Sequence, residues 1–221
     1  IDDLGGLDLN ITQGEMNQIN KYKKDVDGVT GKNTPNVTQY GLVHLDGTQA
    51  TTYARIRKLS GDDFKRASRQ RIVLQAMLEK AKKANPATLV KICNSMVDDI
   101  STTLSLDQMV SLAKDVTKYK ISSTTGFPTD LTTKNMPRCG DTVIPADLVT
   151  NVKKLHEYMF DDAAYTPSQT VQAISETIVN TTGITADSAK INTSDYNETV
   201  GATGTDEIQK GSETTGGTNV Q

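Results

Sequence analysis

The chain has 221 residues, of which 35% are hydrophobic, and it carries a net charge of −3 at pH 7. No apolar run approaches the roughly 18 residues that span a membrane, and no secretory signal peptide is visible. The two cysteines and two histidines match no metal-ligand spacing, so a zinc site is not expected.

The first part of the sequence predicts short strands and helices in alternation. Residues 7–11 (LDLNI) alternate between apolar and polar positions, which is typical of a strand with one buried face. The polar segment 12–40 is rich in glycine and asparagine and predicts a short helix followed by a long surface loop. Strand character returns at residues 41–47 (GLVHLDG), where Asp46 is a suitable N-cap for a short helix over 47–53.

Five of the six arginines lie between residues 53 and 71, in the sequence YARIRKLSGDDFKRASRQR. From residue 55 to residue 71 the chain carries seven lysines and arginines and only two aspartates, so this segment is strongly basic within an acidic protein. If the chain is extended at residue 53, alternation places Arg55 and Arg57 on the same face.

A helix is expected to follow, capped by Asp62 or Asp63 and ending near Ala84, because apolar residues recur there at helical spacing. Three polar residues of its first two turns share one face: Arg66, Arg69 and Gln70. A helix N-terminus favours anions, and two unit charges about 4 Å apart repel by roughly 4 kcal/mol at an effective dielectric constant of about 20. Arginine binds phosphate oxygens through paired hydrogen bonds, so the clustered arginines predict a ligand with several phosphate oxygens.

Other interpretations of this basic segment stay open. A cation-rich helix start is often only a solvated surface, and an aspartate before a helix is more often an N-cap than a metal ligand. Asp63 is therefore either a cap that neutralises Arg66 or a ligand for Mg²⁺, which binds carboxylates together with ligand phosphates. Nucleic acid is disfavoured, because the basic residues are confined to one stretch and the chain has no Trp and only three Phe for base stacking.

The second half of the sequence predicts further helices interleaved with strands. Helical spacing of apolar residues predicts helices over 86–100, 106–116, 148–159 and, more weakly, 168–180. The strand-like segments are YKISS (119–123) and DTVIP (141–145). This interleaving predicts an α/β fold in which helices cover a sheet. Residues 181–221 contain 22 Thr, Ser, Gly and Asn among 41 positions, which predicts a disordered tail.

Three motifs together resemble the LytR–CpsA–Psr (LCP) family of bacterial cell-wall proteins. They are IDDLGGLDLNI (1–11), HLDGTQATTYARIR (44–57) and DDFKRASRQRIVLQAMLEK (62–80), in the family's order and spacing. The later segments VIPADLVTNVKKLHEYMF and YTPS resemble the end of the same domain. The resemblance covers residues 1–167, followed by a weak helix or linker over 168–180 and the polar tail over 181–221.

The resemblance implies a fold, a location and an activity. LCP proteins are α/β/α sandwiches with a central mixed sheet flanked by helices, and an N-terminal helix anchors them on the outer face of the membrane of Gram-positive cells. They bind polyprenyl-pyrophosphate lipids and transfer the linked anionic glycopolymer, of teichoic acid or capsule type, onto peptidoglycan. The transfer is a Mg²⁺-assisted phosphotransfer that leaves polyprenyl phosphate.

The resemblance also implies roles for individual residues. The pyrophosphate-binding residues of the family fall on Arg55, Arg57, Arg66, Arg69 and Gln70. The acidic residue of the family's third motif falls on Asp63, which is expected to assist the metal or to accept the proton of the attacking hydroxyl. Arg55, Arg66 and Asp63 are therefore the expected catalytic residues. Two alternatives remain: a protein that binds the lipid or glycopolymer without chemistry, and a nucleic-acid-binding transcriptional regulator.

One departure from the family is large, because the chain begins at the IDDLGG motif, and the first half of the family's domain and the membrane anchor are missing. Asp63 alone is then expected to bind Mg²⁺ weakly. The chain is expected to be poorly stable by itself, and either it is part of a longer protein or it lacks activity alone. For Cys93 and Cys139 the residues alone leave two options, a disulfide contributing roughly 4 kcal/mol in the chain-entropy model or two buried free thiols. The extracellular location that the resemblance implies favours the disulfide.

Overall fold

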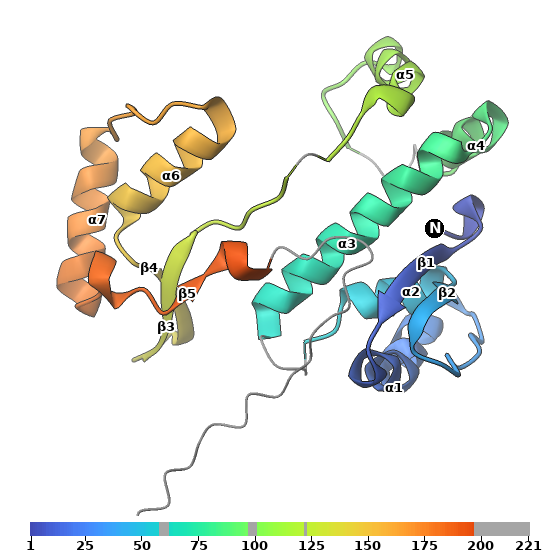
Figure 1. Cartoon of the computed structure of the whole chain (residues 1–221), viewed down its shortest axis with the longest axis horizontal. Coiled ribbons are helices and arrows are strands. Elements are labelled where there is room, and N and C mark those ends of the chain that lie inside the picture. Colours follow the sequence, from blue (N-terminus) through green and yellow to red (C-terminus); the bar gives the residue numbers. More distant parts are fainter. Residues whose placement is uncertain (58–61, 97–100, 122, 197–221) are drawn as a thin grey trace, which may run out of the picture.

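The computed structural model describes residues 1–57, 62–96, 101–121 and 123–196, and the elements of these residues fall into two groups along the chain (Figure 1). The first group is β1 (Leu7–Ile11), α1 (Gln13–Thr30), β2 (Gly41–Leu45), α2 (Gly47–Ala54), α3 (Asp62–Lys83), α4 (Pro86–Met96) and α5 (Leu106–Lys114). The second group is β3 (Asp130–Met136), β4 (Gly140–Pro145), α6 (Leu148–Phe160), α7 (Gln169–Thr182) and β5 (Ile191–Asn192).

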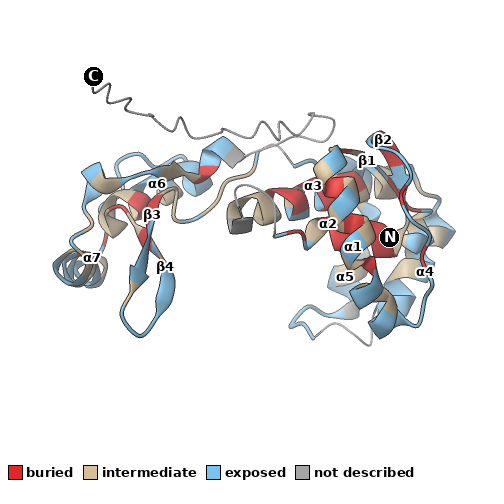
Figure 2. Ribbon diagram, turned by 90° about the horizontal axis from the view of Figure 1, so that it is seen from below, coloured by how far each residue is buried: buried red, intermediate tan, exposed pale blue. Residues whose placement is uncertain are grey.

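The core of the first group lies between one face of a two-stranded sheet and the helices α1, α2 and α3. β1 pairs antiparallel with β2, with Leu7 opposite Leu45 and Ile11 opposite Gly41. The alternation predicted for residues 7–11 is confirmed, because the three apolar side chains of β1 are buried and Asp8 is exposed. Figure 2 shows most of the buried residues gathered in this group, around β1, β2, α2 and α3.

The glycine at position 6 is required by its backbone conformation and by its close approach to β2. Gly6 has φ +75°, and a Cβ atom there would lie 2.7 Å from the carbonyl oxygen of Leu45 on β2. Only glycine therefore fits between η1 (Asp2–Leu4) and the start of the sheet. The carbonyl oxygens of Gly5 and Gly6 accept hydrogen bonds from Lys80 Nζ at 2.9 and 2.7 Å, which ties the N-terminal turn to α3.

Both α1 and α2 begin at a side chain that caps the helix. α1 begins at a capping box, in which Thr12 Oγ1 accepts from Glu15 N and Glu15 Oε2 accepts from Thr12 N. The predicted N-cap at Asp46 is confirmed, since Asp46 Oδ1 accepts from Gln49 N at 2.8 Å. The helix predicted within residues 12–40 is longer than expected, because α1 spans 18 residues.

Side chains of α1 fix the loop that joins it to β2. Asn20 exchanges two hydrogen bonds with the backbone of Val37, both of 2.8 Å. Lys23 is buried and donates to the carbonyl oxygen of Thr34. Hydrogen bonds from the Thr34 side chain and backbone hold the pKa of Asp27 below its usual value. The predicted long surface loop is thus attached to α1 by polar contacts.

The second group contains a three-stranded antiparallel sheet with the order β4-β3-β5. The predicted strand over 141–145 is confirmed as β4, which pairs along β3 from Gly140 to Pro145. The strand predicted over 119–123 is wrong for its described residues, 119–121 and 123, which belong to no strand. The described residues 119–121 and 123 lie between η3 (Val116–Lys118) and β3, where they have no strand partner.

The predicted disordered tail is corrected for residues 181–196. α7 ends at Thr182, and β5 then pairs with β3 through Ile191 opposite Leu131. After β5, Thr193 Oγ1 lies 3.0 Å from the Gly126 carbonyl oxygen and its N–H donates to Thr129 O at 2.8 Å. These contacts are mostly backbone hydrogen bonds, so a composition low in apolar residues does not exclude them. Residues 197–221 lie outside the described part of the chain.

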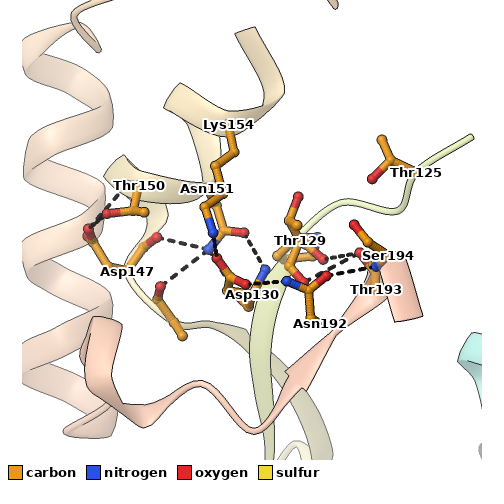
Figure 3. A network of polar contacts seen from close by, with 12 residues as sticks. Thr125, Thr129, Asp130, Asp147, Thr150, Asn151, Lys154, Asn192, Thr193 and Ser194 are labelled. Carbon is orange, nitrogen blue, oxygen red and sulfur yellow. Dashed lines mark hydrogen bonds and ion pairs between the residues drawn. The ribbon is translucent and has the colours of Figure 1, made fainter. Parts of the chain in front are cut away.

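A buried asparagine joins β3 to α6 (Figure 3). Asn151 is 0% exposed, and its Nδ2 lies within hydrogen-bond distance of the carbonyl oxygens of Asp130, Ala146 and Asp147. Its Oδ1 accepts from Asp130 N at 2.9 Å. The Asp130 carboxylate in turn accepts from Lys154 and Asn192, so the same network reaches β5.

Asp147 caps α6 and links it to α7. Its carboxylate accepts from the backbone N–H groups of Val149 and Thr150 and, at 2.8 Å, from Ser175 Oγ on α7. Burial raises the pKa of Asp147, but hydrogen bonds from Thr150, Ser175 and the backbone outweigh it and leave the pKa below its usual value. The carboxylate therefore stays ionised as the N-cap.

The predicted α/β class is confirmed. The single central mixed sheet is not seen, because the strands of the described residues pair in two separate antiparallel sheets. Within the same residues, no helix combines the length and the apolar character that crossing a membrane requires.

The predicted disulfide is wrong, and so is the alternative of two buried thiols. Cys93 and Cys139 are both free and exposed. Cys93 lies on α4 of the first group, whereas Cys139 lies in the turn between β3 and β4 of the second, so the two residues belong to different parts of the fold.

We expect a thiol reagent such as Ellman's reagent to modify two thiols per chain in the native, unreduced protein. The reason is that both sulfhydryl groups are exposed without a disulfide between them. Cys93→Ser should leave one reactive thiol. Native protein that reacts only after reduction would contradict this expectation.

Candidate functional site

Two arginines of the basic segment meet at a cavity beside α1. The cavity has a volume of about 170 Å³ and is lined by Tyr22, Asp25, Val26, Thr52, Arg55, Ile56 and Arg57. The first three residues come from α1, Thr52 comes from α2, and the last three form the turn that follows α2, here called the 55–57 turn. Among the described lining residues, Arg55, Arg57 and Asp25 are the charged ones.

The 55–57 turn is not the predicted strand. α2 continues to Ala54, and Arg55 is its C-cap with φ −101° and ψ −3°. The N–H groups of Arg55 and Ile56 donate to the carbonyl oxygens of Thr52 and Tyr53, at 3.0 and 3.2 Å. The helix that Asp46 caps therefore takes in Tyr53 and Ala54, and residues 55–57 form the turn at its end instead of a strand. Arg55 and Arg57, which are expected on the same face, nevertheless line the same cavity.

The residue between the two arginines, Ile56, is buried and anchors the turn. Ile56 is 2% exposed and belongs to the hydrophobic core, whereas Arg55 and Arg57 on either side of it are exposed. The buried Ile56 anchors the turn in the core, while the two exposed arginines beside it both line the cavity. Two cations in one lining favour an anionic ligand, and arginine in particular favours phosphate.

Arg69 lies elsewhere, which contradicts the expectation that it binds pyrophosphate. It is 3% exposed, and its Nε donates to Glu15 Oε1 at 2.6 Å. Its Nη1 donates to the carbonyl oxygen of Ile56 at 3.4 Å, and its guanidinium carbon lies 6.0 Å from the centre of the Tyr53 ring. These contacts occupy Arg69 inside the protein.

Two further predicted residues, Arg66 and Gln70, are not among the described lining residues of the cavity. Arg66 is partly buried on α3 and Gln70 is exposed on the same helix. The side chain of Asp63 lies outside the part of the chain whose side chains are described, so its roles as catalytic residue and metal ligand stay predictions. No group of three or more His, Cys, Asp or Glu that could hold a metal is found among the described residues.

Sequence reasoning missed the contribution of α1. Tyr22, Asp25 and Val26 are three and four positions apart, so they share one face of that helix. The face is polar at two of these positions, and nothing local distinguishes it from a solvated helix surface. Glu15 was missed for a different reason, since its partner Arg69 is 54 residues away in the sequence.

The comparisons with known proteins decide the family. Residues 1–137 match the model of the LytR_cpsA_psr family, and this span is more than half of the chain. The chain belongs to the LytR_cpsA_psr family. The match contains every residue of the cavity, together with α1 to α5. No curated protein matches the sequence.

Membership of the LytR_cpsA_psr family confirms the resemblance drawn from the three sequence motifs. It indicates a role in cell-wall biogenesis, as a glycopolymer transferase or attenuator. The matched span ends in the turn after β3, so α6 and α7 lie beyond it. The predicted domain end at residue 167 therefore stays a prediction.

Proposed function

We propose that this LytR_cpsA_psr protein is a phosphotransferase that moves a polyprenyl-pyrophosphate-linked anionic glycopolymer onto peptidoglycan, at the outer face of a Gram-positive cell membrane. The observation that supports the proposal is the cavity that Arg55 and Arg57, from one turn, line together with residues of α1. Two arginines in one lining suit a diphosphate, which offers several oxygens to paired N–H donors.

In the proposed reaction a hydroxyl group of peptidoglycan attacks the phosphorus atom that carries the glycopolymer. A new P–O bond forms, the bond to the bridging oxygen breaks, and the electron pair leaves with polyprenyl phosphate. Arg55 and Arg57 stabilise the negative charge that develops on the phosphate oxygens. The hydroxyl proton passes to a base, for which Asp63 is the predicted candidate, with Arg66 as a further predicted cation.

A magnesium requirement is part of the proposal. Mg²⁺ takes one or two carboxylates together with substrate phosphates, and Asp63 is its predicted ligand. In the proposed reaction Arg55 and Arg57 supply positive charge to the phosphate oxygens beside the ion. Chelation is expected to stop turnover and to leave most of the lipid binding, because the guanidinium groups bind the pyrophosphate without the ion.

Arg55→Ala and Arg57→Ala test the proposal. Each charge-assisted hydrogen bond contributes roughly 1.5–3 kcal/mol, so each variant is expected to release polyprenyl phosphate from a lipid-linked teichoic acid precursor about 10- to 100-fold more slowly. Arg138→Ala is the matched control, because Arg138 is the arginine outside the basic segment and lies exposed in the turn between β3 and β4.

The outcomes separate the proposal from its alternatives. Release at the wild-type rate by both variants removes the two arginines from the mechanism. Tight lipid binding without turnover, in wild type with Mg²⁺ present, identifies a binding protein instead of a transferase. Binding of duplex DNA with a steep salt dependence identifies a nucleic-acid-binding regulator.

A further inference from the structure

We propose that Arg69 is a positioning residue, which holds the 55–57 turn against the start of α1 and thereby sets the arrangement of the two arginines at the cavity. This inference rests on the proposed function, because it concerns the same cavity. It assigns Arg69 a role through the protein interior instead of through contact with the pyrophosphate.

The contacts of Arg69 join three elements that build the cavity. Its Nε is paired with Glu15 at the start of α1, its Nη1 contacts the Ile56 carbonyl oxygen in the 55–57 turn, and its guanidinium group faces the Tyr53 ring on α2. Because α1, α2 and the turn supply the described lining residues, one buried side chain connects the three elements that form this part of the cavity.

The partner of Arg69 is itself fixed in place. Glu15 is buried, and its second carboxylate oxygen, Oε2, accepts from Thr12 N at 3.0 Å. The Glu15 N–H donates to Thr12 Oγ1 at 3.2 Å. Both oxygens of the carboxylate are thus used, one for the capping box and one for Arg69. Tyr22 and Asp25 follow Glu15 on the same rigid helix, so fixing its start also fixes the α1 wall.

The contact of Arg69 with the Ile56 carbonyl oxygen affects the positions of Arg55 and Arg57. Ile56 lies between Arg55 and Arg57, so a shift of its carbonyl group moves both flanking residues. Arginine can reach Glu15 and Ile56 together because its donors form a planar fork, whereas the single ammonium group of lysine can satisfy one of them at a time. Arg69→Lys therefore keeps the buried charge and removes the bridge.

The test compares Arg69→Lys with wild type, and uses Arg138→Lys at the exposed arginine as the matched control. Binding of geranyl pyrophosphate, a soluble polyprenyl pyrophosphate, is measured by calorimetry on the full chain. Hydrogen exchange of the Arg55 and Ile56 amides is measured on the ligand-free protein. We expect Arg69→Lys to weaken binding at least tenfold and to speed exchange of these two amides at least tenfold. Arg138→Lys should change neither value by more than twofold.

Three results would overturn the inference. Weaker binding with unchanged exchange shows that Arg69 touches the ligand directly. Faster exchange with unchanged binding shows that the turn does not need this bridge for its function. Equally faster exchange along β1 and α1 shows a general loss of stability instead of positioning. Failure of the proposed function gives a different result, in which Arg55→Ala and Arg57→Ala bind geranyl pyrophosphate as tightly as wild type. The hydrogen-exchange measurement is independent of that result.

Discussion

Glu15→Ala is expected to lower the free energy of unfolding of the N-terminal part of the chain by about 3–5 kcal/mol. The substitution leaves the Arg69 guanidinium, which is 3% exposed, without its carboxylate partner. Removing one partner of a buried ion pair costs far more than the pair contributes, because the remaining charge stays desolvated. The same change also removes the side chain that accepts from Thr12 N in the capping box, a loss of roughly 1 kcal/mol by itself.

Urea unfolding followed by circular dichroism, with hydrogen exchange of the β1 amides to assign the transition, measures this effect. Glu79→Ala is the matched control, because Glu79 pairs with Lys82 at 2.9 Å on an exposed face of α3. Exposed pairs contribute about 0–1 kcal/mol, so the control should unfold close to wild type. A Glu15→Ala variant that loses no more stability than this control would show that the Arg69–Glu15 pair is not buried in solution.

Asn151→Ala is expected to lower the free energy of unfolding of the C-terminal part by roughly 2–4 kcal/mol. The side chain accepts from Asp130 N and contacts three carbonyl oxygens at a position that water does not reach. Each buried polar group left without a partner costs about 1–3 kcal/mol. The loss should be concentrated where β3 meets α6, since Asn151 joins these two elements.

Hydrogen exchange at the Asp130 amide is the most direct measurement of this second effect, because that N–H donates to Asn151 itself. Asn135→Ala provides the comparison, since Asn135 lies on the same strand and is exposed. Exposed substitutions usually change stability by no more than about 0.5 kcal/mol. Protection of Asp130 that survives in Asn151→Ala would mean that another group satisfies this amide.

Features set by neighbouring residues can be predicted from the sequence. The Asp46 cap depends on Gln49 three residues later, and β1 depends on simple alternation, so both are predictable and both are found. The 55–57 segment resembles a strand in its alternation, but the same pattern is equally compatible with a helix end. The structure has the helix end, since α2 runs to Ala54 with Arg55 as its C-cap, and the residue at which a helix stops is hard to judge from local pattern alone.

Features that depend on distant partners cannot be predicted in this way. Arg69 has the spacing of a ligand-binding residue on α3, and only the fold brings Glu15 to it. The Asp25 and Tyr22 side of the cavity escapes prediction because a polar helix face gives no sign of what it faces. The structure of residues 183–196 could not be predicted for a third reason. Composition indicates how much apolar surface a segment can bury, but not the backbone pairing that holds β5.

The short strand β5 has a practical consequence for anyone who shortens this protein for crystallisation. Cutting at the start of the Thr-rich region, after Asn180, would delete Ile191 and Asn192 and strip one edge of β3 of its partner. An uncovered strand edge offers unpaired N–H and C=O groups to other molecules and promotes aggregation. Cutting after Tyr196 keeps the strand and also the Thr193 contacts that fasten it to residues 126–129.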